Sequence, residues 1–94
     1  MDSMHWIYQD LHLGVVRMNG AVRGTDVVAE LHGLYSDSAW QRGFDTLWDA
    51  RSIDMLDFSL LDLSAFREQS ASMMEAQGSG RIAIAVHREV VFDI

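Results

Sequence analysis

Asp49 and Arg51 are the residues of this sequence whose types and spacing most favour ligand chemistry. Side chains two residues apart on a strand share one face, and we expect this pair at the carboxyl end of a central strand. Ligands of open α/β sheets usually bind at that end. An Asp-x-Arg pair can also hold the following loop through a hydrogen-bonded ion pair, and we favour this structural role. The pair remains a candidate contact for a ligand or a protein partner.

Ser59 is a candidate for regulation by phosphorylation. It stands three residues before Asp62, a weak variant of the capping box that predicts a helix N-terminus. Exposed backbone N–H groups and the helix dipole at such an end stabilise an added phosphate, so a phosphoswitch is physically sensible. The alternative is a simple N-cap serine, and we favour that interpretation.

Three tryptophans are a large aromatic content for so short a chain: Trp6, Trp40 and Trp48. Side chains of this size line ligand pockets, and more often they fill cores or anchor interfaces. We expect Trp40 to pack down as a lid on the edge of the core. Trp40 and Trp48 are kept as candidate contacts for a ligand or partner.

Metal, cofactor and covalent chemistry have little support in the sequence. The four histidines are scattered over different predicted elements: His5, His12, His32 and His87. The glycines do not follow the spacing of a phosphate-binding loop, and the chain contains neither cysteine nor lysine. An enzyme would have to bring Asp49, Arg51 and His87 together. We therefore predict no catalytic residue, no metal site and no cofactor.

Charge and size restrict the partners and the location. The 94 residues carry 14 acidic and 7 basic side chains, a formal net charge of -7. This charge repels phosphate backbones, so we expect no nucleic-acid partner. We also expect no membrane insertion and no secretory signal, hence a cytoplasmic protein. One domain over residues 1–94 is expected, and its small core favours a homodimer.

Hydrophobic periodicity and glycine punctuation predict the element order β-β-α-β-α-β. The expected elements are strands 5–9 and 11–18, a helix from Thr25 or Asp26 to around Ser36-Asp37, a strand 44–50, a loop 51–57, a helix from Ser59 through Met74, and a strand 81–86. Strands separated by helices pair in parallel, so we expect an α/β fold with one mixed sheet of about four strands. The helices should cover mainly one face, which leaves the other as a docking surface. Val90 to Ile94 are expected to begin a helix.

Several short motifs together resemble the SpoIIAA-like group of bacterial proteins, which has the STAS fold of the anti-sigma-factor antagonists. These motifs are Thr25-Asp26-Val27, Ser36-Asp37-x-x-Trp40, Leu47-Trp48-Asp49-Ala50-Arg51 and Arg81-Ile82-Ala83-Ile84-Ala85-Val86, after a strand that ends at Gly20. The resemblance implies a C-terminal helix that is truncated at Ile94. It also implies a switch serine at the start of the helix after the central strand, which is the region of Ser59.

The resemblance and the lack of a catalytic set favour a non-catalytic regulatory or protein-interaction module of STAS type. The alternative is a small-molecule or lipid carrier of SEC14-like type, in which tryptophans would floor an apolar pocket. An enzyme built on Asp49, Arg51 and His87 is the third hypothesis.

Overall fold

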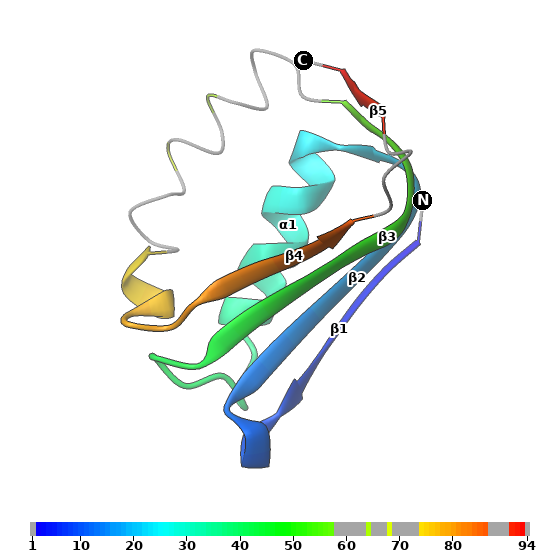
Figure 1. The fold of residues 1–94 in the computed structure, drawn as a ribbon. Helices are drawn as coiled ribbons and strands as arrows, with labels where there is room; N and C mark the ends of the chain where they lie inside the picture. Colours follow the sequence, from blue (N-terminus) through cyan, green and yellow to red (C-terminus); the bar gives the residue numbers. More distant parts are fainter. Residues whose placement is uncertain (1, 58–63, 65–67, 69–73, 87–90, 94) are drawn as a thin grey trace.

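The structure, a computed structural model, describes residues 2–57, 64, 68, 74–86 and 91–93. Its elements in chain order are β1 (Asp2–Tyr8), the short 3-10 helix η1 (Gln9–Leu11), β2 (Leu13–Arg23), α1 (Gly24–Tyr35), β3 (Asp45–Asp57), β4 (Ile82–Val86) and β5 (Val91–Asp93). Residues 74–77 are also helical. The predicted α/β class with one mixed sheet is confirmed, and α1 crosses one face of that sheet (Figure 1).

The strand order is β1-β2-β3-β4. β1 and β2 form the expected antiparallel hairpin, which turns through η1. β2, β3 and β4 are parallel, because helical segments connect them. β5 also pairs in parallel with β3, at Met55 to Asp57. Since β2 occupies the other edge of β3 along its whole length, β4 and β5 lie along one shared edge.

β3 is nearly twice as long as we expected, and the predicted loop 51–57 is its second half. Relative to β2, this strand contains one extra residue between the partners of Arg17 and Asn19, and another between the partners of Gly20 and Ala21. Such β-bulges shift the alternation of side chains between the two faces. The buried side chains of this half therefore recur every third residue: Ala50, Ile53 and Leu56.

Two other predicted boundaries are wrong for related reasons. β2 continues past Asn19 to Arg23, because Gly20 adopts a φ of 78° at the second bulge and does not end the strand. The C-terminal residues Val91 to Asp93 form a strand where we expected the start of a helix. In both cases the segment forms a strand because its backbone pairs with β3, and the local sequence does not indicate this pairing.

The core lies between α1 and the sheet. Its buried members come from β2, α1 and β3: Val16, Met18, Val22, Val27, Leu34, Ala50, Ile53 and Leu56. Gly14 allows α1 to approach closely, since a Cβ atom there would lie 3.0 Å from Leu34 Cδ1 and 2.7 Å from Trp40 Cζ3. The expected lid is confirmed, because Trp40 packs partly buried against this core and its Nε1 donates to the carbonyl of Ala76 at 2.9 Å.

α1 begins and ends close to the predicted residues. Its N-cap is Arg23, whose backbone N–H donates to the Asp26 carboxylate at 2.9 Å. Asp26 thus contributes to the cap from inside the helix, where we had expected Thr25 or Asp26 to be the cap itself. The helix ends at Tyr35, just before the predicted end around Ser36-Asp37. Within the described residues, no helix is long and apolar enough to cross a membrane.

Candidate functional site

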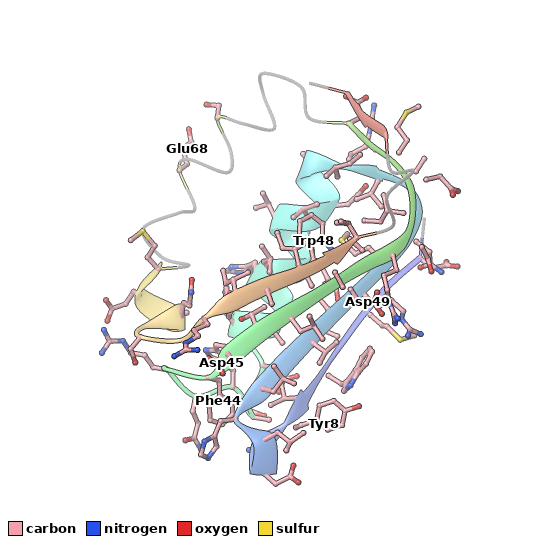
Figure 2. All side chains as sticks on the ribbon, viewed as in Figure 1. Tyr8, Phe44, Asp45, Trp48, Asp49 and Glu68 are labelled. Carbon is pink, nitrogen blue, oxygen red and sulfur yellow. The ribbon has the colours of Figure 1, made fainter. Side chains whose placement is uncertain are left out.

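The sheet has one face covered by α1 and one face that α1 does not touch, which we call the open face. Successive side chains along each strand point alternately to the α1 face and to the open face. Trp48 points to the side of α1 and Asp49 to the open face (Figure 2). Pairing across the strands then defines two rows on the open face. The first row is Met4, Arg17, Asp49 and Ala85. The second row, next to the first, is Trp6, Val15, Leu47 and Ala83.

Asp49 lies between two arginines in the first of these rows. Arg51 forms a two-point ion pair with it, with Nε 2.9 Å from Oδ1 and Nη2 3.0 Å from Oδ2. Arg17 Nε of β2 lies 3.3 Å from the same Oδ2 atom. The Asp49 side chain is 11% exposed, whereas the side chains of Arg17 and Arg51 are 47% and 63% exposed. A buried carboxylate therefore holds two guanidinium groups at the surface.

The first bulge of β3 creates this arrangement. Ala50 and Arg51 both stand opposite Met18 of β2, so neither pairs in register with that strand. The Arg51 backbone N–H is directed to Asp49 Oδ1 at 3.3 Å. The carboxylate therefore satisfies backbone as well as side-chain donors, which fixes the geometry of the bulge.

These contacts determine the protonation of the cluster. The Arg51 side-chain hydrogen bonds hold the pKa of Asp49 well below its usual range, and burial opposes them only in part. The Arg51 backbone N–H and Arg17 lower the pKa further. The Asp49 carboxylate in turn raises the pKa of Arg51. The cluster consequently keeps one negative and two positive charges at neutral pH, a local net charge of about +1.

Apolar side chains surround the charged cluster on the open face. Met4 and Tyr8 of β1 are 55% and 43% exposed. Trp6 lies between them on the same face and contacts Tyr8 edge-on, with ring centroids 6.3 Å apart. Val15, the register partner of Trp6, is only 6% exposed although it is on the face that α1 does not cover. Trp6 therefore covers Val15 and builds an aromatic surface beside the arginines.

The structure brings only part of the predicted site together. Asp49 and Arg51 pair as expected, but within β3 at a bulge and not at the carboxyl end of the strand. Trp48 belongs to the opposite face, and Trp40 lies in the segment between α1 and β3. Neither tryptophan adjoins the cluster. Ser59 and His87 lie outside the described residues, so the phosphoswitch and the three-residue enzyme set stay predictions.

Arg17, Met4 and Trp6 are the open-face residues that the sequence analysis did not associate with Asp49. The alternation in β2 indicates that Arg17 is exposed, but only the register of β2 against β3 places it beside Asp49. In the same way, the hairpin register brings Met4 to Arg17. No local signal in the sequence predicts these pairings.

A second polar cluster lies between β1 and α1, on the other face. His5 Nδ1 is 3.0 Å from Glu30 Oε1, and His5 Nε2 is 3.3 Å from Asp37 Oδ2. Ser3 Oγ donates to the second Glu30 oxygen at 2.9 Å. Both imidazole nitrogens of His5 therefore face carboxylates, and the cluster connects β1 to α1. Among the described residues no group of side chains has the composition and geometry for a metal ion.

Comparison with known proteins identifies no relative. No family model matches the chain, and no curated protein or solved structure is significantly similar to it.

Proposed function

We propose that this chain is a non-catalytic protein-interaction module that docks a protein partner on its open sheet face. The observation that carries the proposal is the combination of exposed Met4 and Tyr8 with the Arg17–Asp49–Arg51 cluster on a face that α1 leaves bare. Exposed apolar side chains beside arginine are typical of the centre of protein interfaces. Aromatic residues and arginine also dominate binding energy there.

The state of Asp49 supports binding over proton transfer. A general acid or base near neutral pH needs a pKa close to that pH. The arginines lower the pKa of Asp49 instead, and they occupy both of its oxygens. A carboxylate in this state orients its neighbours and does not exchange protons at neutral pH.

We further propose that the module is of the STAS type, with a regulatory role in the cytoplasm. The order of a hairpin, a helix and a parallel strand supports this assignment, as do the sequence motifs that the resemblance rests on. The sheet face that α1 does not cover also supports association with a second copy, which is the form that a homodimer would take.

Retention of partners on the immobilised protein tests the docking face. The wild type should retain a defined set of proteins from the source cell, and the double variant Met4→Glu and Tyr8→Glu should lose them. Docking would bury the two new carboxylates against an apolar partner surface, which is unfavourable. In the free protein both positions are exposed enough that the substitutions should leave the fold intact. Quantitative mass spectrometry of the retained proteins is the measurement.

The control is Met74→Glu, which places one such carboxylate at another exposed methionine, one that is 70% exposed and outside the open face. It should retain the wild-type set. Equal losses in the control and the double variant would contradict docking on the open face. A small-molecule adduct in native mass spectra that the double variant keeps would favour the carrier alternative instead.

A further inference from the structure

We propose that Arg17 and Arg51, held by Asp49, bind a carboxylate from an acidic, partly apolar segment of the partner protein. This inference rests on the proposed function and names the chemistry that the open face recognises. Its first basis is the number of donors that remain. A guanidinium group has five N–H donors. Among the described residues, Asp49 engages two side-chain donors of Arg51 and one of Arg17.

The second basis is the shared anchor. Arg17 Nε and Arg51 Nη2 lie 3.3 and 3.0 Å from one atom, Oδ2 of Asp49, so the two guanidinium groups are neighbours. Their orientation is set before any partner arrives, because the carboxylate between them is buried. Preorganised donors lose less side-chain entropy on binding. A second carboxylate above the cluster can therefore accept hydrogen bonds from both arginines.

The third basis is the balance of charge. Two guanidinium groups around one carboxylate leave a local excess of about +1, which one further carboxylate would neutralise. The whole chain has a formal net charge of -7, which disfavours multiply charged ligands such as nucleic acid. A single carboxylate matches the local excess, and the repulsion from the remaining acidic groups is smallest for it.

The fourth basis is the surroundings of the cluster. In its row, Asp49 has Ala85 of β4 on one side and Arg17, then Met4, on the other. Alanine leaves the space above the carboxylate uncovered from that side. The exposed Met4 side chain in this row, Trp6 in the next row and Tyr8 beyond Trp6 supply apolar contact. This combination selects a carboxylate carried by an apolar segment over a free inorganic anion.

Binding of labelled peptides tests the inference directly. The probe is an end-capped hexapeptide with one glutamate among leucine and serine residues, and its control replaces that glutamate with glutamine. Fluorescence anisotropy should show binding of the acidic peptide that weakens as salt is added. Arg17→Gln should weaken it about tenfold or more, because hydrogen bonds to charged groups are lost. This variant should keep the fold, since Arg17 is half exposed and makes one side-chain bond among the described residues.

Arg42→Gln is the charge-matched control, because Arg42 is exposed and its hydrogen bond goes to the Glu75 carbonyl, away from the open face. It should bind the acidic peptide like the wild type. Equal affinities for the two peptides, or equal weakening by Arg17→Gln and Arg42→Gln, would overturn the inference. Inorganic phosphate that binds more tightly than the acidic peptide would overturn it too, since the site would then take a free anion.

The two proposals fail in different ways. If Arg17→Gln still retains the proteins that the Met4 and Tyr8 double variant loses, the open face docks a partner without recognising a carboxylate. If the double variant also keeps them, the proposed function itself is wrong.

Discussion

The contacts of the Asp49 carboxylate fix both its orientation and its charge. It is almost buried, and it accepts hydrogen bonds from Arg51 at two side-chain nitrogens, from the Arg51 backbone and from Arg17. Burial of a carboxylate costs free energy unless it is paired, and here the arginines compensate that cost. The result is a fixed charge that positions both guanidinium groups at the surface.

Asp49→Asn should lower the free energy of unfolding by about 1 to 2 kcal/mol at pH 7, because charge-assisted hydrogen bonds become weaker neutral ones. The folded state lowers the pKa of Asp49 from an ordinary value of 3.8. The carboxylate therefore adds stability above that value and loses it as the pH falls toward the lowered pKa. The difference between wild type and variant should shrink below about pH 4. Urea unfolding from pH 7 to pH 2 measures it.

Asp54→Asn is the control for this prediction, since Asp54 is an exposed carboxylate of the same strand. Its substitution should leave the free energy of unfolding within about 0.5 kcal/mol at every pH. A wild-type advantage over Asp49→Asn that grows as the pH falls would contradict the assigned ion pair.

Two glycines have different roles in the packing of α1 on the sheet. Gly14 of β2 lies beneath Leu34 and Trp40, where no room remains for a methyl group. Gly33 lies within α1, and a Cβ atom there would meet His5 Cε1 at 3.5 Å, an ordinary contact distance. Glycine is thus required at the first position for close approach, whereas at the second it only weakens the helix.

Gly33→Ala should raise the free energy of unfolding by up to about 1 kcal/mol, because alanine is the better helix former and the site accepts its methyl group. Gly14→Ala should lower it by about 1 to 3 kcal/mol, because an extra carbon in a packed core forces the neighbours apart. Thermal and chemical unfolding of the two variants give the comparison. Destabilisation by both substitutions would mean that α1 sits closer to β1 than the His5 distance indicates.

Net charge acts on the molecule as a whole. The formal charge of -7 makes the carboxylates repel one another on average, and folding brings them closer together. Dissolved salt screens this repulsion, which extends about 10 Å at 0.1 M ionic strength. The local excess of positive charge at Arg17 and Arg51 is therefore an exception on an acidic protein.

The Tm should rise by a few degrees when sodium chloride increases from about 10 to 150 mM, because screening reduces the repulsion among carboxylates. Differential scanning calorimetry at constant pH measures the change. A Tm that falls as salt is added would show instead that attractive pairs such as Arg51 with Asp49 dominate the electrostatic free energy.

Much of the fold follows from the sequence. The amphipathic period from Val27 to Tyr35 predicts α1, and glycine punctuation predicts the hairpin, because both signals are local. The second half of β3 was not predictable in this way. Its buried residues repeat every third position only because β2 imposes two bulges on it, and this constraint comes from residues more than 30 positions earlier.

The sequence by itself determined the class of the fold, the acidic charge and the pairing of Asp49 with Arg51, since these depend on composition or on neighbours along the chain. Only the tertiary structure decided that Arg17 joins the pair and that Met4 and Trp6 lie beside it. The physical reason is register. A shift of one residue in any strand would send each of these side chains to the opposite face, and the register is set by contacts between strands.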